Sequence, residues 1–205
     1  QRQVLAQGRQ RLGRPRRVRL DEAQRASLRG GSLGSLAELW RVIAPAVQVA
    51  TGVEPGKLGF SRGDRIALRK LGDRYEPVAS ALACFGVSDA EIYVSPARSG
   101  IARAIAAATP ILCVSADVAA AETASHRFLL GRAVANLAEE LATLAYLREG
   151  ELGWPLAAAL RACDITTLPP DIADTIDVDE PTIAERAKVL KKEMSRKQKA
   201  LVQDI

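Results

Sequence analysis

Apolar residues recur at alternating spacings of four and three positions between residues 123 and 147. They are Leu130, Val134, Leu137, Leu141 and Leu144. This spacing places them along one side of an α-helix, and Ser125 is a suitable residue to cap the first turn. The opposite side carries polar residues, among them Arg132, Asn136 and Glu140. We therefore expect a long central helix over residues 123–147.

Five further segments have the apolar spacing of amphipathic helices. They cover residues 20–28, 35–49, 65–85, 155–163 and 181–202. Pro45 should end or bend the second of these helices, because proline lacks the N–H that a helix interior requires. Gly86 follows the third helix and suits the left-handed conformation of a C-terminal cap.

Two short segments have the composition of β-strands. Residues 90–95 alternate in polarity and include β-branched and aromatic side chains, whereas residues 110–115 form a continuous apolar run. Residues 101–108 fit either a strand or a helix, and the glycine-rich residues 51–64 are expected to form a loop. We predict an α+β fold that is mostly helical, with a small sheet packed on the long central helix.

Composition divides the chain into four parts. Residues 1–30 form a basic arm, residues 31–165 the main α+β domain, residues 166–180 an acidic linker that contains proline, and residues 181–205 a basic C-terminal helix. The chain begins at Gln1 rather than at a methionine, so we expect it to be part of a longer protein.

Positive charge is concentrated in the N-terminal arm. The net charge is +5, but residues 1–30 hold nine arginines against Asp21 and Glu22, a local balance of +7, so the remainder sums to −2. One function to consider is therefore binding of nucleic acid or another anionic partner through this arm and the basic C-terminal helix. The residues expected to contact such a partner are Arg14, Arg16, Arg17, Lys192 and Lys197. Against this function, no aromatic residue that would stack on bases precedes Trp40.

The three cysteines, Cys84, Cys113 and Cys163, are widely spaced and lie in apolar segments. We interpret them as buried, reduced thiols rather than as a disulfide framework or a metal site. No apolar run approaches the roughly 18 residues that a membrane span requires, and the arginine-rich N-terminus lacks the apolar region of a signal peptide. We therefore expect a cytoplasmic protein without a membrane partner.

Residues 87–137 contain a strand, a second apolar strand (PILCVS), a short helix and the sequence RFLLG. This order resembles the core of the gluzincin metallopeptidases, in which the same elements lead into a helix that carries the zinc-binding motif HExxH. The resemblance covers residues 58–147 and rests on the order of the elements and on their apolar pattern. It implies a zincin-like fold of the kind found as a domain in large bacterial multidomain proteins.

The catalytic positions of that motif are not matched. Arg132 stands where the resemblance places the first zinc-binding histidine, Ala133 replaces the general-base glutamate, and Asn136 replaces the second histidine. Arginine is always charged and does not bind zinc, alanine has no proton acceptor, and asparagine is a poor zinc ligand. His126 is the only histidine of the chain, and we interpret it as a cap or surface residue. We therefore expect a domain that is not a zinc enzyme and binds no cofactor, and an enzyme of another kind is a third interpretation of the sequence.

The resemblance then implies a pseudo-metallopeptidase domain that acts as a protein-interaction or scaffold module of a larger cytosolic bacterial protein. Its partner would be another protein or another domain of the same longer chain. Arg132, Asn136 and Glu140 are the candidate partner contacts in a vestigial cleft. The alternative interpretation of the same residues is a solvated helix face.

Three other site chemistries lack their required residues. The glycine-rich residues 30–35 are followed by no P-loop lysine. A serine hydrolase would need a positioned histidine base, and His126 alone provides no triad. The acidic residues of 168–180 do not have the spacing of an EF-hand.

Overall fold

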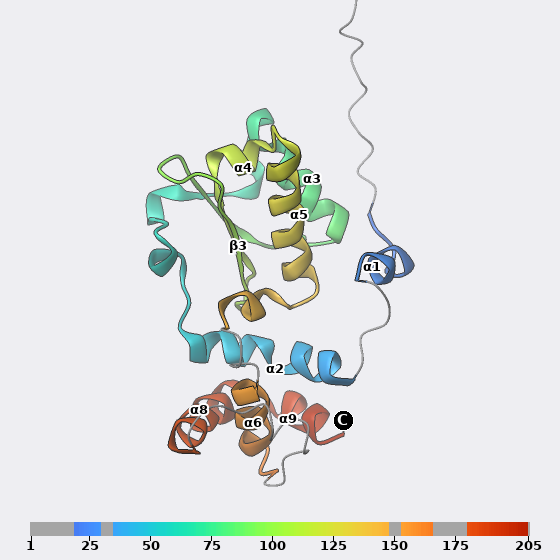
Figure 1. The fold of residues 1–205 in the computed structure, drawn as a ribbon, viewed down its shortest axis with the longest axis vertical. Helices are drawn as coiled ribbons and strands as arrows, with labels where there is room; N and C mark the ends of the chain where they lie inside the picture. The colour runs from blue at the N-terminus through green and yellow to red at the C-terminus, as the bar shows by residue number, and fades with distance from the viewer. Residues whose placement is uncertain (1–18, 30–34, 148–152, 166–179, 205) are drawn as a thin grey trace, which may run out of the picture.

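A computed structural model describes residues 19–29, 35–147, 153–165 and 180–204 of the chain. These residues form a mixed sheet with helices packed against it and, below it in the view of Figure 1, a separate group of four helices. The predicted α+β class is confirmed, and helices make up most of the described structure.

Four strands make up the sheet, in the order β1-β2-β4-β3. They are β1 (Arg65–Ile66), β2 (Glu91–Ser95), β3 (Ala102–Ile105) and β4 (Ile111–Ser115). The central strands β2 and β4 run parallel, with Ile92 opposite Leu112, and each has an antiparallel neighbour on its outer side. The strands predicted over residues 90–95 and 110–115 are confirmed. The ambiguous segment 101–108 forms β3, which pairs with β4 as a hairpin.

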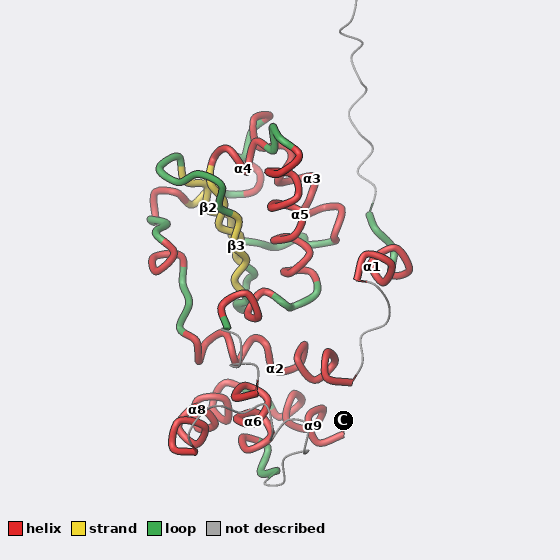
Figure 2. Tube along the Cα trace, in the orientation of Figure 1, coloured by secondary structure: helices red, strands yellow, loops and turns green. Residues whose placement is uncertain are grey.

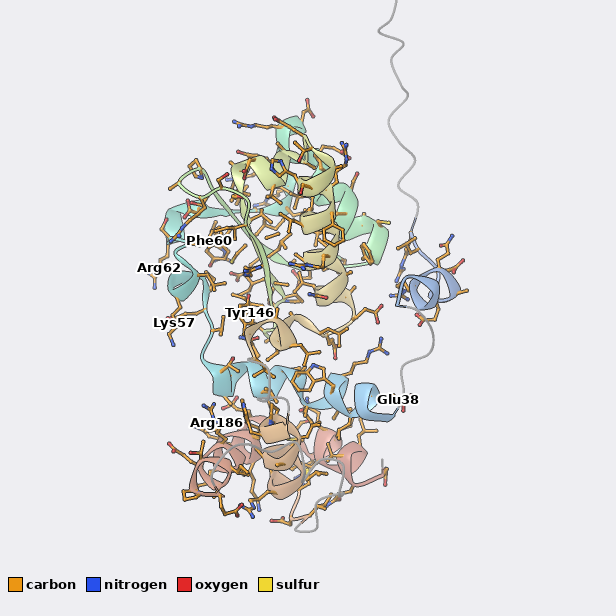
Figure 3. The ribbon with its side chains drawn as sticks, in the orientation of Figure 1. Glu38, Lys57, Phe60, Arg62, Tyr146 and Arg186 are labelled. Atoms are coloured by element: carbon orange, nitrogen blue, oxygen red, sulfur yellow. The ribbon has the colours of Figure 1, made fainter. Side chains whose placement is uncertain are left out.

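One face of the sheet is covered by α3 (Glu76–Phe85), α4 (Ala116–Ala120) and α5 (Ala124–Ala138) (Figure 2). We call the sheet and these three helices the α/β lobe. Its core side chains without exposed surface include Val78, Ile92, Leu112, Val114, Val118 and Val134. The other face of the sheet carries a smaller apolar cluster around Phe60, whose position is labelled in Figure 3.

Four further helices share a second core, and we call them the helical lobe. They are α2 (Ser35–Thr51), α6 (Gly153–Ala162), α8 (Glu180–Glu193) and α9 (Arg196–Asp204). Arg186 on α8 places its guanidinium over the ring of Trp154 at 4.3 Å and donates a hydrogen bond to the carbonyl of Ala50 at 3.1 Å (Figure 3). This one side chain therefore joins three of the four helices. The helices on both sides of the predicted linker at 166–180 belong to this core.

The helix predicted over residues 35–49 is confirmed as α2. It does not end at Pro45 but continues to Thr51, because the buried residues on either side of the proline pack into one core and hold the helix together. One prediction for the helical lobe is wrong. The helix predicted over residues 181–202 is divided into α8 and α9. The division is made by a capping box, in which Ser195 Oγ accepts from the N–H of Gln198 at 3.2 Å and Gln198 Oε1 accepts from the N–H of Ser195 at 2.8 Å.

The central helix is shorter than the predicted range of 123–147, because α5 ends at Ala138. Glu140 has a left-handed φ of 58°, and the N–H of Leu141 donates to the carbonyl of Asn136 at 2.9 Å. This Schellman arrangement terminates helices and usually places a glycine at the left-handed position. Since that position is a glutamate here, the sequence contained no helix-ending glycine from which the end could be predicted.

The start of α5 also differs from the prediction. The N-terminal cap is Thr123 rather than Ser125, and its hydroxyl accepts from the N–H of His126 at 3.1 Å. After α5 the chain forms a 3-10 turn over Ala142–Tyr146, which lies against β3.

The helix predicted over residues 65–85 is wrong in its first half. The segment consists of β1, α3 and, between them, the 3-10 turns Leu68–Lys70 and Asp73–Tyr75. Gly72 separates the two turns with a positive φ of 65°, which interrupts a continuous helix. Pro77 lies in the first turn of α3, where its missing N–H costs no helical hydrogen bond. Gly86 ends α3 with a φ of 75°, as predicted.

The first described helix, α1 (Glu22–Arg29), confirms the helix predicted over residues 20–28. Figure 1 shows it beside the α/β lobe. The N–H of Leu20 donates to the carbonyl of Cys84 at 2.8 Å, which attaches the chain before α1 to the last turn of α3.

Candidate functional site

The exposed side of α5 carries a cation stacked on an aromatic ring. The guanidinium of Arg132 lies 5.8 Å from the ring centre of Phe128, whose side chain is 65% exposed. Asn136 is half-buried one turn further along, and Ala133 is buried against the sheet. Two of the three predicted contact residues, Arg132 and Asn136, thus lie on one stretch of helix.

The third predicted contact residue, Glu140, does not share this helical face. It follows the end of α5 in a left-handed conformation, so the expected four-residue periodicity from Asn136 is broken. Its neighbour Glu139 is buried and forms an ion pair with Arg41 of α2. The two consecutive glutamates therefore have different environments, and Glu139 joins the two lobes.

The residues on α5 do not provide the chemistry of a zinc peptidase. Arg132 and Asn136 occupy the positions that the resemblance gives to two imidazoles, and neither residue is a useful zinc ligand. His126 lies in the first turn, with its Nε2 3.8 Å from a carboxylate oxygen of Asp117. Across the described ranges, no group of three or more His, Cys, Asp or Glu side chains is arranged to hold a metal ion.

Asp117 is the centre of a polar cluster that sequence reasoning missed. Its carboxylate accepts from the hydroxyl of Ser99 at 2.7 Å and from the N–H groups of Gly100 and Val118 at 3.0 and 2.8 Å. Hydrogen bonds from Ser115 and then Ser99 hold the pKa of this carboxyl well below its usual range. The cluster fixes the loop before β3 to the start of α4. The low pKa keeps this carboxylate ionised, so that it accepts these hydrogen bonds and holds the two segments together.

The edge of the sheet next to α5 is closed by side chains of the chain itself. The N–H of Ser115 donates to the carbonyl of Ile101, so the alternate residues Ala102 and Ala104 direct their carbonyls away from β4. Tyr146 donates its hydroxyl to the carbonyl of Ala104 at 2.8 Å. The guanidinium of Arg103 donates to the carbonyl of Ala102 at 3.4 Å. A peptide strand would have to displace these contacts to pair with β3.

An open groove lies at the opposite edge of the sheet, between β1, the turn that follows it and the C-terminal half of α3. Its volume is about 1430 Å³, and we call it the β1–α3 groove. Apolar side chains line it, including Ile66, Leu68, Leu82 and Val87. The carbonyls of the last turn of α3 already accept hydrogen bonds from the N–H groups of Leu20, Gly86 and Val87.

The charged residues that line the β1–α3 groove are mostly basic. They are Arg19, Arg65, Arg69 and Lys70, with Asp89 and Glu91 as the acids. Arg65 is paired with Glu91 at 2.7 Å. Within the described part of the chain, Arg69 and Lys70 are exposed and have no carboxylate at ion-pair distance. The groove therefore has an excess of positive charge along its rim.

The basic residues predicted to contact an anionic partner are divided between the lobes or lie outside the description. Arg14, Arg16 and Arg17 are outside the described residues. Lys192 and Lys197 are exposed on α8 and α9 in the helical lobe. The guanidinium of Arg19, the first described arginine, lies instead against Gly86 of the α/β lobe.

The burial predicted for the cysteines is confirmed for two of the three. All three are free, with Cys113 and Cys163 buried and Cys84 half-buried. Burial raises the pKa of the Cys113 thiol to about 12, which keeps it protonated and therefore a poor nucleophile.

Comparisons with known proteins add no relative of this chain: no family model matches it, and no curated protein or solved structure matches it either. Among the described helices, none is long and apolar enough to cross a membrane.

Proposed function

We propose that this chain is a non-catalytic, zincin-like protein-interaction module that holds a segment of its partner in the β1–α3 groove. The partner is another protein or another domain of a longer polypeptide that contains this chain. The sequence resemblance implies a scaffold function, and we assign that function to the β1–α3 groove.

The observation that carries the proposal is the β1–α3 groove itself. A volume of about 1430 Å³ exceeds the roughly 300–1,000 Å³ of a typical small-molecule pocket. Its apolar lining offers burial to several side chains of a bound segment. Grooves of this kind next to a sheet edge or a helix are a recurring way of binding peptides.

The arrangement around α5 supports the non-catalytic part of the proposal. Arg132 and Asn136 supply no zinc ligand, and Ala133 is buried where a general base would be required. At the adjacent sheet edge the hydroxyl of Tyr146 bonds the carbonyl of Ala104, so a substrate strand would have to displace it in order to pair there. We still predict that a partner contacts Arg132 and Asn136. Glu140 is no longer included in that predicted contact, because it does not share their helical face.

A peptide selection tests the proposal. Peptides are selected on the wild-type chain from a random display library, and their dissociation constants are measured by fluorescence anisotropy. Ala83→Phe fills the groove from α3, and we expect it to weaken binding by at least about tenfold, which corresponds to roughly 1.4 kcal/mol. Leu201→Ser alters an exposed apolar side chain of α9 in the helical lobe and should leave the affinity unchanged.

Two results would contradict the proposal. One is a set of peptides whose affinity is insensitive to Ala83→Phe, and the other is cleavage of a bound peptide, detected by mass spectrometry. Circular dichroism shows whether Ala83→Phe is folded. If it is not, Ala67→Phe fills the same groove from an exposed position that tolerates a larger side chain.

A further inference from the structure

We infer that the occupant of the β1–α3 groove is an extended peptide segment in which acidic residues alternate with apolar residues. This inference rests on the proposed function and names the chemistry of the partner. It is argued from the shape of the groove, its charge and the residue types that are missing from its lining.

The position of the groove favours an extended backbone. β1 is the outermost strand, because it pairs with β2 on one side only. One residue of a two-residue antiparallel edge strand directs its N–H and C=O away from the sheet, where an added strand forms backbone hydrogen bonds. In such a strand the side chains alternate between two sides. One set would contact the apolar lining, and the other would contact the rim.

The charge of the rim favours acidic side chains in the second set. Four of the charged lining residues are basic and two are acidic, and the pair Arg65–Glu91 neutralises one of each. Arg69 and Lys70 lie in the 3-10 turn that follows β1 and lack a carboxylate partner among the described residues. Arg19 contributes a third cation from the chain segment that leads into α1. Carboxylates of a bound segment would meet these cations in a partly desolvated groove, where charge pairing selects the partner.

The lining disfavours a nucleic acid as the anionic occupant. Single-stranded nucleic acids bind to aromatic side chains on which their bases stack, and the residues that line the groove include no aromatic side chain. Asp89 and Glu91 would also repel a continuous phosphate backbone. Aliphatic side chains such as Leu68 and Val87 suit valine, leucine or isoleucine of a peptide instead.

A panel of four fluorescent probes tests the inference by anisotropy. The first peptide has about ten residues that alternate between aspartate and apolar residues, a length of roughly 33 Å when extended. The second peptide has lysine in place of aspartate, and the third has serine in place of the apolar residues. The fourth probe is an oligothymidylate of similar length.

We expect the first peptide to bind more tightly than the other three probes. Arg69→Glu and Lys70→Glu should each weaken its binding by about threefold to tenfold. Raising the ionic strength from about 50 mM to about 300 mM should weaken it further, since screening shortens the range of charge pairing. Arg62→Glu makes the same change of charge on the loop before β1, away from the groove lining, and should have no effect (Figure 3).

The outcomes separate failure of the inference from failure of the proposed function. If the lysine or serine peptide binds as tightly as the first peptide and Ala83→Phe abolishes that binding, the groove is a binding site and the acidic, apolar chemistry is wrong. If oligothymidylate binds most tightly, the inference is overturned in favour of nucleic acid. If no probe binds, or if binding is unaffected by Ala83→Phe and Ala67→Phe, both the inference and the assignment of the groove are overturned.

Discussion

The guanidinium of Arg41 on α2 forms an ion pair with the carboxylate of Glu139, just beyond the end of α5. The glutamate side chain is 7% exposed and the arginine side chain 35%. The contact joins the helical lobe to the α/β lobe, and a nearby hydrogen bond from Thr143 to Gln48 at 3.1 Å crosses the same junction. The two cores are therefore linked by polar groups at a buried position as well as by the chain.

Removing the cation of this pair should destabilise the protein. We expect Arg41→Ala to lower the free energy of unfolding by about 2 kcal/mol, less than the roughly 3–5 kcal/mol of a fully buried pair because Arg41 is partly exposed. Adding Glu139→Gln should recover part of the loss, since the buried charge is then removed as well. Urea unfolding followed by circular dichroism measures the effect. An equal loss in Arg62→Ala, which removes an exposed arginine, would show that the pair contributes nothing.

Lowering the pH should lower the free energy of unfolding, because Asp117 becomes protonated. Its folded-state pKa is lowered, so its stabilising effect is present above the unfolded value near 3.9 and is lost as the pH falls toward the lower folded value. We expect Asp117→Asn to cost about 2 kcal/mol at neutral pH and to reduce the loss of stability below about pH 4. Urea midpoints measured across that range test this. Asp73→Asn, at an exposed aspartate, is the matched control, and a similar change in both variants would contradict the prediction.

The left-handed residue after α5 offers a stabilising substitution. Glu140 has a φ of 58°, a conformation that glycine adopts without steric cost. We expect Glu140→Gly to raise the free energy of unfolding by about 0.5–1 kcal/mol. Ala135→Gly, inside the same helix, should lower it by about 1 kcal/mol. Thermal unfolding of both variants gives the comparison, and destabilisation by Glu140→Gly would show that its side chain is needed at the lobe junction.

The cysteines should differ in reactivity. Cys84 is half-buried, whereas Cys113 has no exposed surface and a pKa raised to about 12 by burial. We expect iodoacetamide to label Cys84 first in the folded protein and all three cysteines in denaturant. Peptide mass spectrometry after timed labelling measures the order. Earlier labelling of Cys113 than of Cys84 would contradict the burial described for β4.

The strands β2 and β4 and the end of α3 could be predicted because local pattern decides them. The run that forms β4 is apolar except for its last residue, Ser115, and Gly86 ends α3 where a left-handed residue is needed. The end of α5 could not be predicted, because its left-handed position holds Glu140 rather than glycine. The stabilising partner of that turn, Arg41, lies far away in the sequence.

The candidate site was accessible to sequence reasoning only in part. The absence of zinc ligands on α5 follows from the identities of Arg132 and Asn136 alone. The β1–α3 groove was missed because its lining combines Arg19, residues 65–70, part of α3 and Thr109, which only the fold brings together. The amphipathic spacing of residues 65–85 also favoured one continuous helix, which would have removed β1 and the groove.

The zinc content of the purified protein tests most directly whether the residues of α5 form a zinc site. The wild-type protein and Arg132→His/Asn136→His, which places two imidazoles four residues apart on one helix face, are titrated with zinc and then dialysed before elemental analysis. We predict that the wild type retains far less than one zinc ion per chain and that the double variant binds zinc more tightly in the titration. One zinc ion per wild-type chain after dialysis would contradict the non-catalytic assignment.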